Sequence, residues 1–273
     1  MSDFLSDPHF EKFRVLIYDS SGITFSNSNR PILESRLRER LRLANMEDVG
    51  AYFDLIKRDA EEMKTFLDSI TTNLTRFFRN QAHFDAMVNH VLPDLVAFKR
   101  QKGQEKRVRV WSAGCSTGEE PYTVAMILKD KLPADFAFDV IASDLSLKSL
   151  MTASQGFYPE PRVQGIPDAY LSRFFTKAGD GYQVKDEVKS RVKFDYHNLK
   201  FDSGLRNLDI IFCRNVLIYF DEAAQKNVID RFWTSMTNHA FLYIGHSESL
   251  FGMNTQFKFL KTEWAVLYNK SID

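Results

Sequence analysis

Residues 107–123, RVRVWSAGCSTGEEPYT, decide the fold. Val108, Val110 and Trp111 form a short apolar run that is typical of a buried strand, and the small residues after it indicate a turn. A helix is expected next, over residues 118–131. A buried strand followed by a small-residue turn and a helix is the first unit of an α/β fold.

The sequence after this unit continues to alternate strands and helices. Further strands are expected at residues 138–143, 208–213 and 241–244, a helix at residues 221–239, and a closing strand pair at residues 257–260 and 264–268. This order predicts an α/β domain over residues 89–273 with a doubly wound, mainly parallel sheet and an antiparallel C-terminal edge. Residues 158–191 are rich in Pro, Gly and charge, and they predict a small antiparallel β insertion.

Residues 1–88 predict a small all-helical domain in front of the sheet. Asp7 and Pro8 are typical of a helix start, and Gly22 is typical of a helix end. Further helices are expected from Pro31, over residues 52–56 and 63–70, and over residues 84–92, where Pro93 kinks or divides the segment.

The composition excludes several classes of protein. Lys and Arg number 36 and so do Asp and Glu, and this zero net charge argues against a protein that mainly coats nucleic acid. Cys115 and Cys213 form neither a metal-ligand set nor a disulfide framework, which fits a reducing compartment. The N-terminus does not resemble a signal peptide, and no run approaches 18 apolar residues. We therefore expect a cytoplasmic, monomeric protein with no metal and no direct membrane insertion.

The turn after the first strand is the candidate ligand site, because ligands of open α/β sheets bind outside the carboxyl ends of the strands. Gly114 and Gly118 bracket this turn, but their spacing is not G-x-G-x-x-G, and no Lys follows as in a P-loop. Glu119 and Glu120 follow instead, and two carboxylates repel phosphate but suit a cationic ligand. Asp144, after the second strand, is placed to bind a ribose. The turn therefore favours a cationic, phosphate-free nucleoside.

Each of these acids also has a structural interpretation. Glu119 could simply cap the helix that starts near Gly118, and Asp144 could be only the N-cap of the next helix. The pattern alone leaves both interpretations open.

Four stretches together are similar to one known family. They are TNLTRFFRN at residues 72–80, WSAGCSTGEEPYT at 111–123, FDVIASDLS at 138–146 and IIFCRNVLIYFD at 210–221. Through them the chain resembles the CheR family of chemotaxis receptor methyltransferases over nearly its whole length. The resemblance implies a class I methyltransferase-like fold that uses S-adenosylmethionine and releases S-adenosylhomocysteine. It also implies methyl transfer to glutamate side chains of chemoreceptors.

The resemblance implies roles for individual residues as well. Those implied to bind the cofactor are Asn73, Thr75, Arg79, Gly114, Glu119, Asp144, Asn198, Leu199, Arg214 and Asn215. Among them, Glu119 is implied to hold the amino end and Asp144 the ribose. Tyr219 is similar to the family tyrosine that faces the methyl group, although Tyr219 and Phe220 could be ordinary core aromatics.

The implied reaction needs no catalytic base. A glutamate side chain has an unperturbed pKa of about 4.3, so it is already a carboxylate nucleophile at neutral pH. Accordingly, the sequence shows no recognisable Ser/His/Asp or Cys/His signature and no zinc-ligand spacing. Arg79 and Tyr219 are the predicted catalytic residues, with the role of orienting the carboxylate. The lone His246 is more simply a structural residue.

The segment PILESRLRERLR at residues 31–42 is locally basic. The resemblance implies that its arginines, Arg36, Arg38, Arg40 and Arg42, dock the cytoplasmic helical methylation region of chemoreceptors. A solvated helix face with internal ion pairs is the alternative. The compact loop at residues 178–186 lacks the insertion associated with binding a receptor tether peptide.

Two other functions remain open from the sequence. One is a methyltransferase that acts on nucleic acid or a small molecule, and the other is a non-catalytic adaptor that binds the cofactor.

Overall fold

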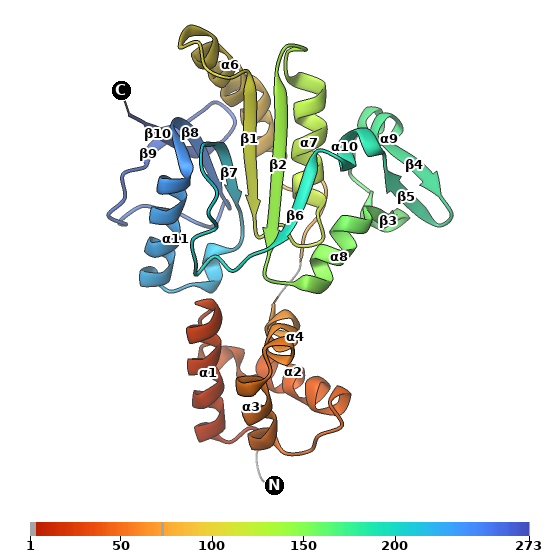
Figure 1. Ribbon diagram of the computed structural model, residues 1–273, viewed down its shortest axis with the longest axis vertical. Coiled ribbons are helices and arrows are strands. Elements are labelled where there is room, and N and C mark those ends of the chain that lie inside the picture. Colours follow the sequence, from red (N-terminus) through yellow and green to blue (C-terminus); the bar gives the residue numbers. More distant parts are fainter. Residues whose placement is uncertain (1–3, 72–73, 273) are drawn as a thin grey trace.

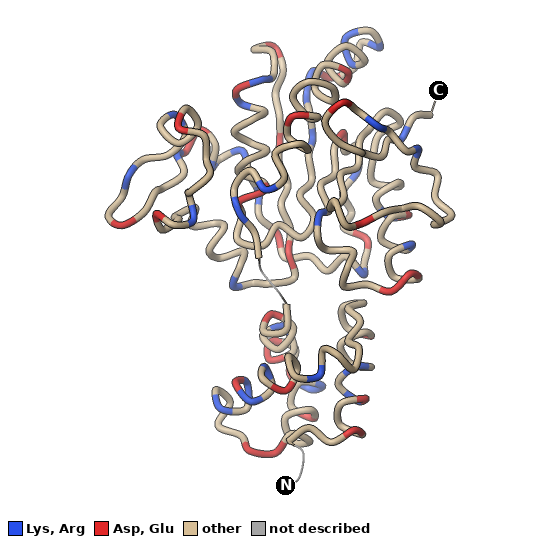
Figure 2. Tube along the Cα trace, turned by 180° about the vertical axis from the view of Figure 1, so that it is seen from behind, with Lys and Arg blue, Asp and Glu red and all other residues tan. Residues whose placement is uncertain are grey.

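The computed structural model describes residues 4–71 and 74–272. A small helical part lies beyond the carboxyl ends of the strands of a larger α/β part, and the arrowheads of β1 and β2 point toward it (Figure 1). Basic and acidic residues are interspersed over both parts, so the even charge balance is not split into opposite halves (Figure 2). Among the described residues, every helix is too short or too polar to span a lipid bilayer.

The helical part is built from short helices. They are α1 (Asp7–Ser21), α2 (Arg30–Leu43), α3 (Val49–Arg58) and α4 (Ala60–Ile70), with the 3-10 turn η1 (Asn27–Asn29) before α2. Ser6 is the N-cap of α1, and Pro8 lies in its first turn. Gly22 ends the helix with a left-handed φ of 78°, which a residue with a Cβ rarely adopts.

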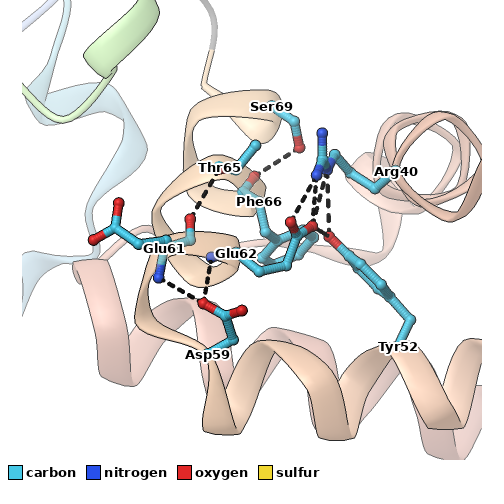
Figure 3. Close-up of polar contacts among 8 residues, drawn as sticks. All are labelled: Arg40, Tyr52, Asp59, Glu61, Glu62, Thr65, Phe66 and Ser69. Carbon is cyan, nitrogen blue, oxygen red and sulfur yellow. Dashed lines mark hydrogen bonds and ion pairs between the residues drawn. The ribbon is translucent and has the colours of Figure 1, made fainter. Parts of the chain in front are cut away.

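An ion pair inside the helical part holds three of its helices together (Figure 3). Arg40 of α2 contacts the two carboxylate oxygens of Glu62 of α4 at 2.6 and 2.8 Å. The hydroxyl of Tyr52 from α3 donates to Glu62 at 2.6 Å, and burial raises the pKa of Tyr52. Arg40 is therefore a structural residue of this domain.

A long irregular helix leads from the helical part to the sheet. It consists of α5 (Gln81–Ala86), the π-helical segment η2 (Met87–Val91) and α6 (Leu92–Gln101). Pro93 lacks a backbone N–H, and it lies in the first turn of α6, directly after the wider π turn. Phe84 and Met87 pack in the core of the sheet. The domain boundary predicted at residues 88 and 89 stays a prediction.

The central sheet has the predicted architecture. Among the described residues it has seven strands in the order β6-β2-β1-β7-β8-β10-β9. Their bounds are Arg107–Ala113 (β1), Ala137–Asp144 (β2), Val192–Tyr196 (β6), Leu208–Cys213 (β7), Met236–Ile244 (β8), Lys258–Lys261 (β9) and Val266–Ser271 (β10). The pairs from β6 to β8 are parallel, whereas β10 pairs antiparallel with β8 and β9. The doubly wound, mainly parallel sheet with an antiparallel edge is confirmed.

Helices cover both faces of the sheet: α7 (Glu119–Lys131), α8 (Leu147–Gln155) and α11 (Glu222–Ser235). Alternate residues of β7 enter different cores, with Ile210 and Phe212 in one cluster and Ile211 and Cys213 in the other. This burial on both faces explains why residues 210–213 of β7 form a continuous apolar run.

The helix predicted over residues 221–239 is too long. It ends at Ser235, and residues 236–239 begin β8 instead. Met236 pairs with Leu208 in the sheet, and its carbonyl accepts a hydrogen bond from Lys270 Nζ at 2.9 Å. These tertiary contacts override the helical pattern.

The small antiparallel β insertion is confirmed. It contains β3 (Phe157–Pro159), η3 (Glu160–Arg162), α9 (Asp168–Phe174), β4 (Phe175–Ala178), β5 (Gly181–Val184) and α10 (Asp186–Lys189), with strand order β3-β5-β4. We call residues 157–189 the inserted subdomain.

A buried ion pair joins α6 to the sheet. Lys99 Nζ lies 2.7 Å from Asp209 Oδ1, with side chains 6% and 1% exposed. The other carboxylate oxygen accepts from the backbone N–H of Arg109 at 2.8 Å. Burial raises the pKa of Asp209, and Lys99 opposes this shift. The carboxylate therefore depends on Lys99 to remain charged.

Asp209→Ala should lower the free energy of unfolding by about 3 to 5 kcal/mol, because Lys99 would be left buried without its counter-ion. Urea unfolding monitored by circular dichroism measures this change. Arg206→Gln is the matched control, since it breaks a pair with Asp202 whose side chains are 44% and 55% exposed. The control should cost about 1 kcal/mol or less. Equal losses of unfolding free energy in Asp209→Ala and Arg206→Gln would contradict the assignment of Lys99 and Asp209 as a buried ion pair.

Candidate active site

A cavity of about 350 Å³ lies between the carboxyl ends of the strands and the helical part. The helical part supplies one wall, and the segments that follow β1, β2, β6 and β7 supply the other. From the helical part come Ser21, Ile23, Thr24, Phe25, Asn29, Ile32, Ile70 and Thr71. This is the place where ligands of open α/β sheets bind.

The structure brings most of the predicted site residues together around this cavity. Those that line it are Thr75, Arg79, Gly114, Asp144, Asn198, Leu199, Arg214, Asn215 and Tyr219. Asn73 lies outside the described residues. Glu119 is not among the lining residues, whereas its neighbour Glu120 is.

The turn after β1 is shaped by its glycines and by hydrogen bonds to β2. Gly114 has a φ of 84°, and a Cβ there would lie 2.4 Å from a methyl carbon of Val216. The backbone N–H groups of Gly114 and Cys115 both donate to the Ser143 carbonyl, at 2.8 and 3.0 Å. Glycine is therefore required at position 114 for both conformation and space.

Asp144 is held at the end of β2 by the same turn. Its Oδ2 accepts from the backbone N–H of Ser116 at 2.7 Å and its Oδ1 from that of Ser146 at 2.8 Å. Burial raises the pKa of Asp144, while these N–H groups act in the opposite direction. Ser146, not Asp144, is the N-cap of α8. The interpretation of Asp144 as the helix N-cap is therefore excluded.

Glu120 is the carboxylate of α7 that lines the cavity, whereas the sequence prediction assigned that place to Glu119. Glu120 accepts from the Ser112 hydroxyl and from Arg214 Nε, each at 2.7 Å. The Glu119 side chain is turned toward the inserted subdomain, where it contacts Arg162. Consecutive helical residues point about 100° apart, so only one of the two can face the cavity. This geometry does not support a cofactor contact by Glu119.

Arg214 is a buried arginine in the cavity wall that contacts several other segments. Besides Glu120, its guanidinium contacts the Arg79 carbonyl at 2.7 Å and His83 Nδ1 at 3.3 Å. Its cationic carbon lies 5.1 Å from the centre of the Phe84 ring. Burial and the neighbouring Arg214 lower the pKa of His83 to about 4. His83 is therefore neutral near pH 7, and its Nδ1 can accept a hydrogen bond from Arg214.

The helical part is bonded directly to the segments that carry site residues. Asn198 Nδ2 donates to the Ser20 carbonyl at 2.7 Å, so this predicted cofactor residue is partly engaged by α1. The backbone N–H of Thr24 donates to the Tyr219 carbonyl at 2.8 Å. Tyr219 ends the 3-10 turn η4 (Leu217–Tyr219), and its half-buried ring lines the cavity. Its place in the wall disfavours a purely core role.

The cavity suits a polar organic ligand. Among the described residues, the buried side-chain polar atoms without a hydrogen-bond partner are Ser116 Oγ, His197 Nε2 and Tyr243 Oη. Ser116 and His197 both line the cavity. Within the same part of the chain, no cluster of His, Cys, Asp and Glu could hold a metal ion. Carboxylates and unused polar groups beside a glycine turn fit a cationic nucleoside.

This fold and cavity define the class I methyltransferases that use S-adenosylmethionine. The family model described as "CheR methyltransferase, SAM binding domain" matches residues 73–266, and "CheR methyltransferase, all-alpha domain" matches residues 8–71. The chain belongs to the CheR methyltransferase family, and it is an enzyme that uses S-adenosylmethionine in chemotaxis.

Relatives cover most of the chain. A chemotaxis protein methyltransferase 2 of Vibrio cholerae is 34% identical over 90% of this chain and 87% of its own. Chemotaxis protein methyltransferases of Borreliella burgdorferi and Escherichia coli are each 35% identical. They cover 87% and 93% of this chain, and 86% and 88% of their own lengths.

The low pKa of His83 should make stability depend on pH. Its pKa is about 4 when folded and 6.5 ordinarily, so the unfolded chain binds the proton first as the pH falls. The contribution of His83 is thus fully present above about pH 6.5 and is lost toward pH 4, by roughly 3 kcal/mol. Urea unfolding across this range, compared between the wild type and His83→Gln, measures the difference. His9→Gln, in α1 and outside the group of residues that shift the pKa of His83, is the control and should follow the wild type.

Proposed function

We propose that this enzyme transfers methyl groups to glutamate side chains of chemoreceptors and so forms methyl esters. The observation that carries the proposal is a single cavity that joins Asp144 and Glu120 to Arg79 and Tyr219. The first pair suits a cationic nucleoside, and the second suits an incoming carboxylate. The names of the relatives support a role in chemotaxis.

Each wall of the cavity has a proposed role toward the cofactor. Asp144 accepts hydrogen bonds from the ribose hydroxyls, and Glu120 with Arg214 faces the amino acid end. Thr75, Gly114, Asn198, Leu199 and Asn215 complete the binding surface. When bound, S-adenosylmethionine supplies an electrophilic methyl group on a cationic sulfonium.

Arg79 and Tyr219 are proposed to orient the acceptor. Arg79 Nη1 donates to the Leu74 carbonyl at 2.7 Å, which fixes the guanidinium while other N–H groups remain to meet a carboxylate. The Tyr219 hydroxyl donates a second hydrogen bond. Because the glutamate is already ionised, these groups need only align it and exclude water.

The mouth of the cavity favours a macromolecular substrate. Ile32, Leu74 and Ile218 line the cavity yet are 48%, 76% and 52% exposed. A partner that covers these side chains would bury them and exclude water from the reacting groups.

The partner surface is proposed to lie on α2, without Arg40. Arg36, Arg38 and Arg42 are exposed, whereas Arg40 is engaged by Glu62. Three exposed arginines suit an acidic helical partner, and we propose the cytoplasmic methylation region of chemoreceptors. The proposal places the enzyme in the cytoplasm.

Incubation with S-adenosylmethionine and a receptor cytoplasmic fragment tests the reaction. Label should enter the receptor as alkali-labile methyl groups, and a fragment with its target glutamates changed to alanine should accept none. Alkali-stable label, or label on the alanine fragment, would exclude glutamate esterification.

Asp144→Ala should bind S-adenosylhomocysteine more weakly by about 1.5 to 3 kcal/mol, as calorimetry measures.

Charge reversal separates docking from folding. Arg36→Glu with Arg42→Glu, both at exposed positions, should raise the KM for the receptor several-fold at low salt, while affinity for S-adenosylhomocysteine and thermal stability change little. Arg40→Glu should instead lower the melting temperature, since it places two carboxylates together beside Tyr52. An unchanged KM in the double variant would remove α2 from the docking surface.

A further inference from the structure

The inserted subdomain contacts the turn after β1 through a charge pair that the proposed reaction does not use. Glu119, the first residue of α7, is buried with 0% exposure. Its cationic partner is Arg162 of η3, whose Nε lies 3.0 Å from Glu119 Oε1 and whose Nη2 contacts the same oxygen. A buried carboxylate is stable as an anion only when such a partner is present.

Thr117 closes this contact into a ring. Its hydroxyl accepts from Arg162 Nη2 at 2.6 Å and donates to Glu119 Oε2 at 2.7 Å. Its backbone carbonyl accepts from the Tyr158 hydroxyl at 2.7 Å. Thr117 belongs to the turn at residues 114–118, so the inserted subdomain holds this turn by both side chain and backbone.

The turn has little room to shift beside these contacts. Gly118 has a φ of 94°, and a Cβ there would lie 2.8 Å from both the Tyr158 hydroxyl and the Ala153 methyl. The turn is also bonded to β2, where the Ser116 N–H donates to Asp144. The turn is thus held between β2 and the inserted subdomain.

A second contact reaches the segment that carries Arg79. The Phe77 ring packs edge-on against Tyr158 and Phe175, with ring centres 4.9 and 5.5 Å away. The Phe78 ring lies 5.3 Å from that of Tyr170. The inserted subdomain therefore positions two separate segments of the cavity wall.

We infer that Arg162 is a positioning residue for the cofactor site. By neutralising Glu119 from the inserted subdomain, it holds residues 114–118 in the shape that binds S-adenosylmethionine. The inference rests on the proposal that the cofactor occupies the cavity beside this turn. It assigns Glu119 to the pair with Arg162 and not to the ligand.

Calorimetric titration with S-adenosylhomocysteine tests this inference on the full chain. Arg162→Gln leaves Glu119 buried without a cation and should weaken binding about tenfold. The double variant Glu119→Gln with Arg162→Gln removes both charges and should regain most of the wild-type affinity. Arg162→Lys keeps the charge but loses the fork geometry, so it should bind between the wild type and Arg162→Gln.

Lys177→Gln is the matched control in the same subdomain. Lys177 pairs with Glu160 on the surface, with side chains 49% and 61% exposed, and its loss should leave the affinity unchanged. Wild-type affinity in Arg162→Gln would overturn the inference. So would a double variant that binds as weakly as Arg162→Gln, because Glu119 would then contact the ligand itself.

Two measurements keep these outcomes separate from misfolding and from failure of the proposed function. The melting temperature without ligand shows whether each variant is folded. If Arg162→Gln is not folded, the affinities of the double variant and of Arg162→Lys decide whether Arg162 has a positioning role. A wild-type chain that did not bind S-adenosylhomocysteine would contradict the proposed function. A wild type that binds, with an Arg162→Gln variant that binds equally, would contradict only the positioning role.

Discussion

The buried pair between Arg214 and Glu120 is the interaction on which the site depends. Their side chains are 4% and 10% exposed, and the pair joins the end of β7 to the first turn of α7. Arg214 also holds the backbone of Arg79 and contacts His83. Three segments far apart in the sequence thus meet at one guanidinium. A charge placed here without these partners would be too costly to bury.

The helical part completes the site from the other side. Its α1 ends against the α/β part, where Asn198 and Lys200 donate to carbonyls at the end of the helix. These carbonyls lie at the C-terminus of α1, where the partial negative charge of the helix favours a lysine. On α4, Asp68 accepts a hydrogen bond from Ser146, whose backbone N–H is bound to Asp144. Asp144 is therefore linked to both parts of the molecule.

The sequence predicted the sheet and the turn because both follow from local patterns. Apolar runs such as residues 210–213 and the small residues around Gly114 leave few other structures open. It assigned Glu119, and not Glu120, to the cofactor site, because the facing of these two residues depends on how α7 is rotated against the inserted subdomain. It grouped Arg40 with exposed arginines, because Glu62 is distant in the chain. The helix end at Ser235 was missed because Met236 pairs with Leu208 in the sheet and is bonded to Lys270, and both partners are distant in the chain.

The way the cavity is divided between the two parts has a consequence for protein engineering. Thr24 and Ile32 on one side and Gly114 and Asp144 on the other are walls of one chamber. A hybrid enzyme that took its helical part from a relative would keep this chamber only if the exchanged segment also carried matching groups at the seam, such as the Ser20 carbonyl and the Thr24 N–H. The two parts are separate in the chain, but they are not interchangeable modules.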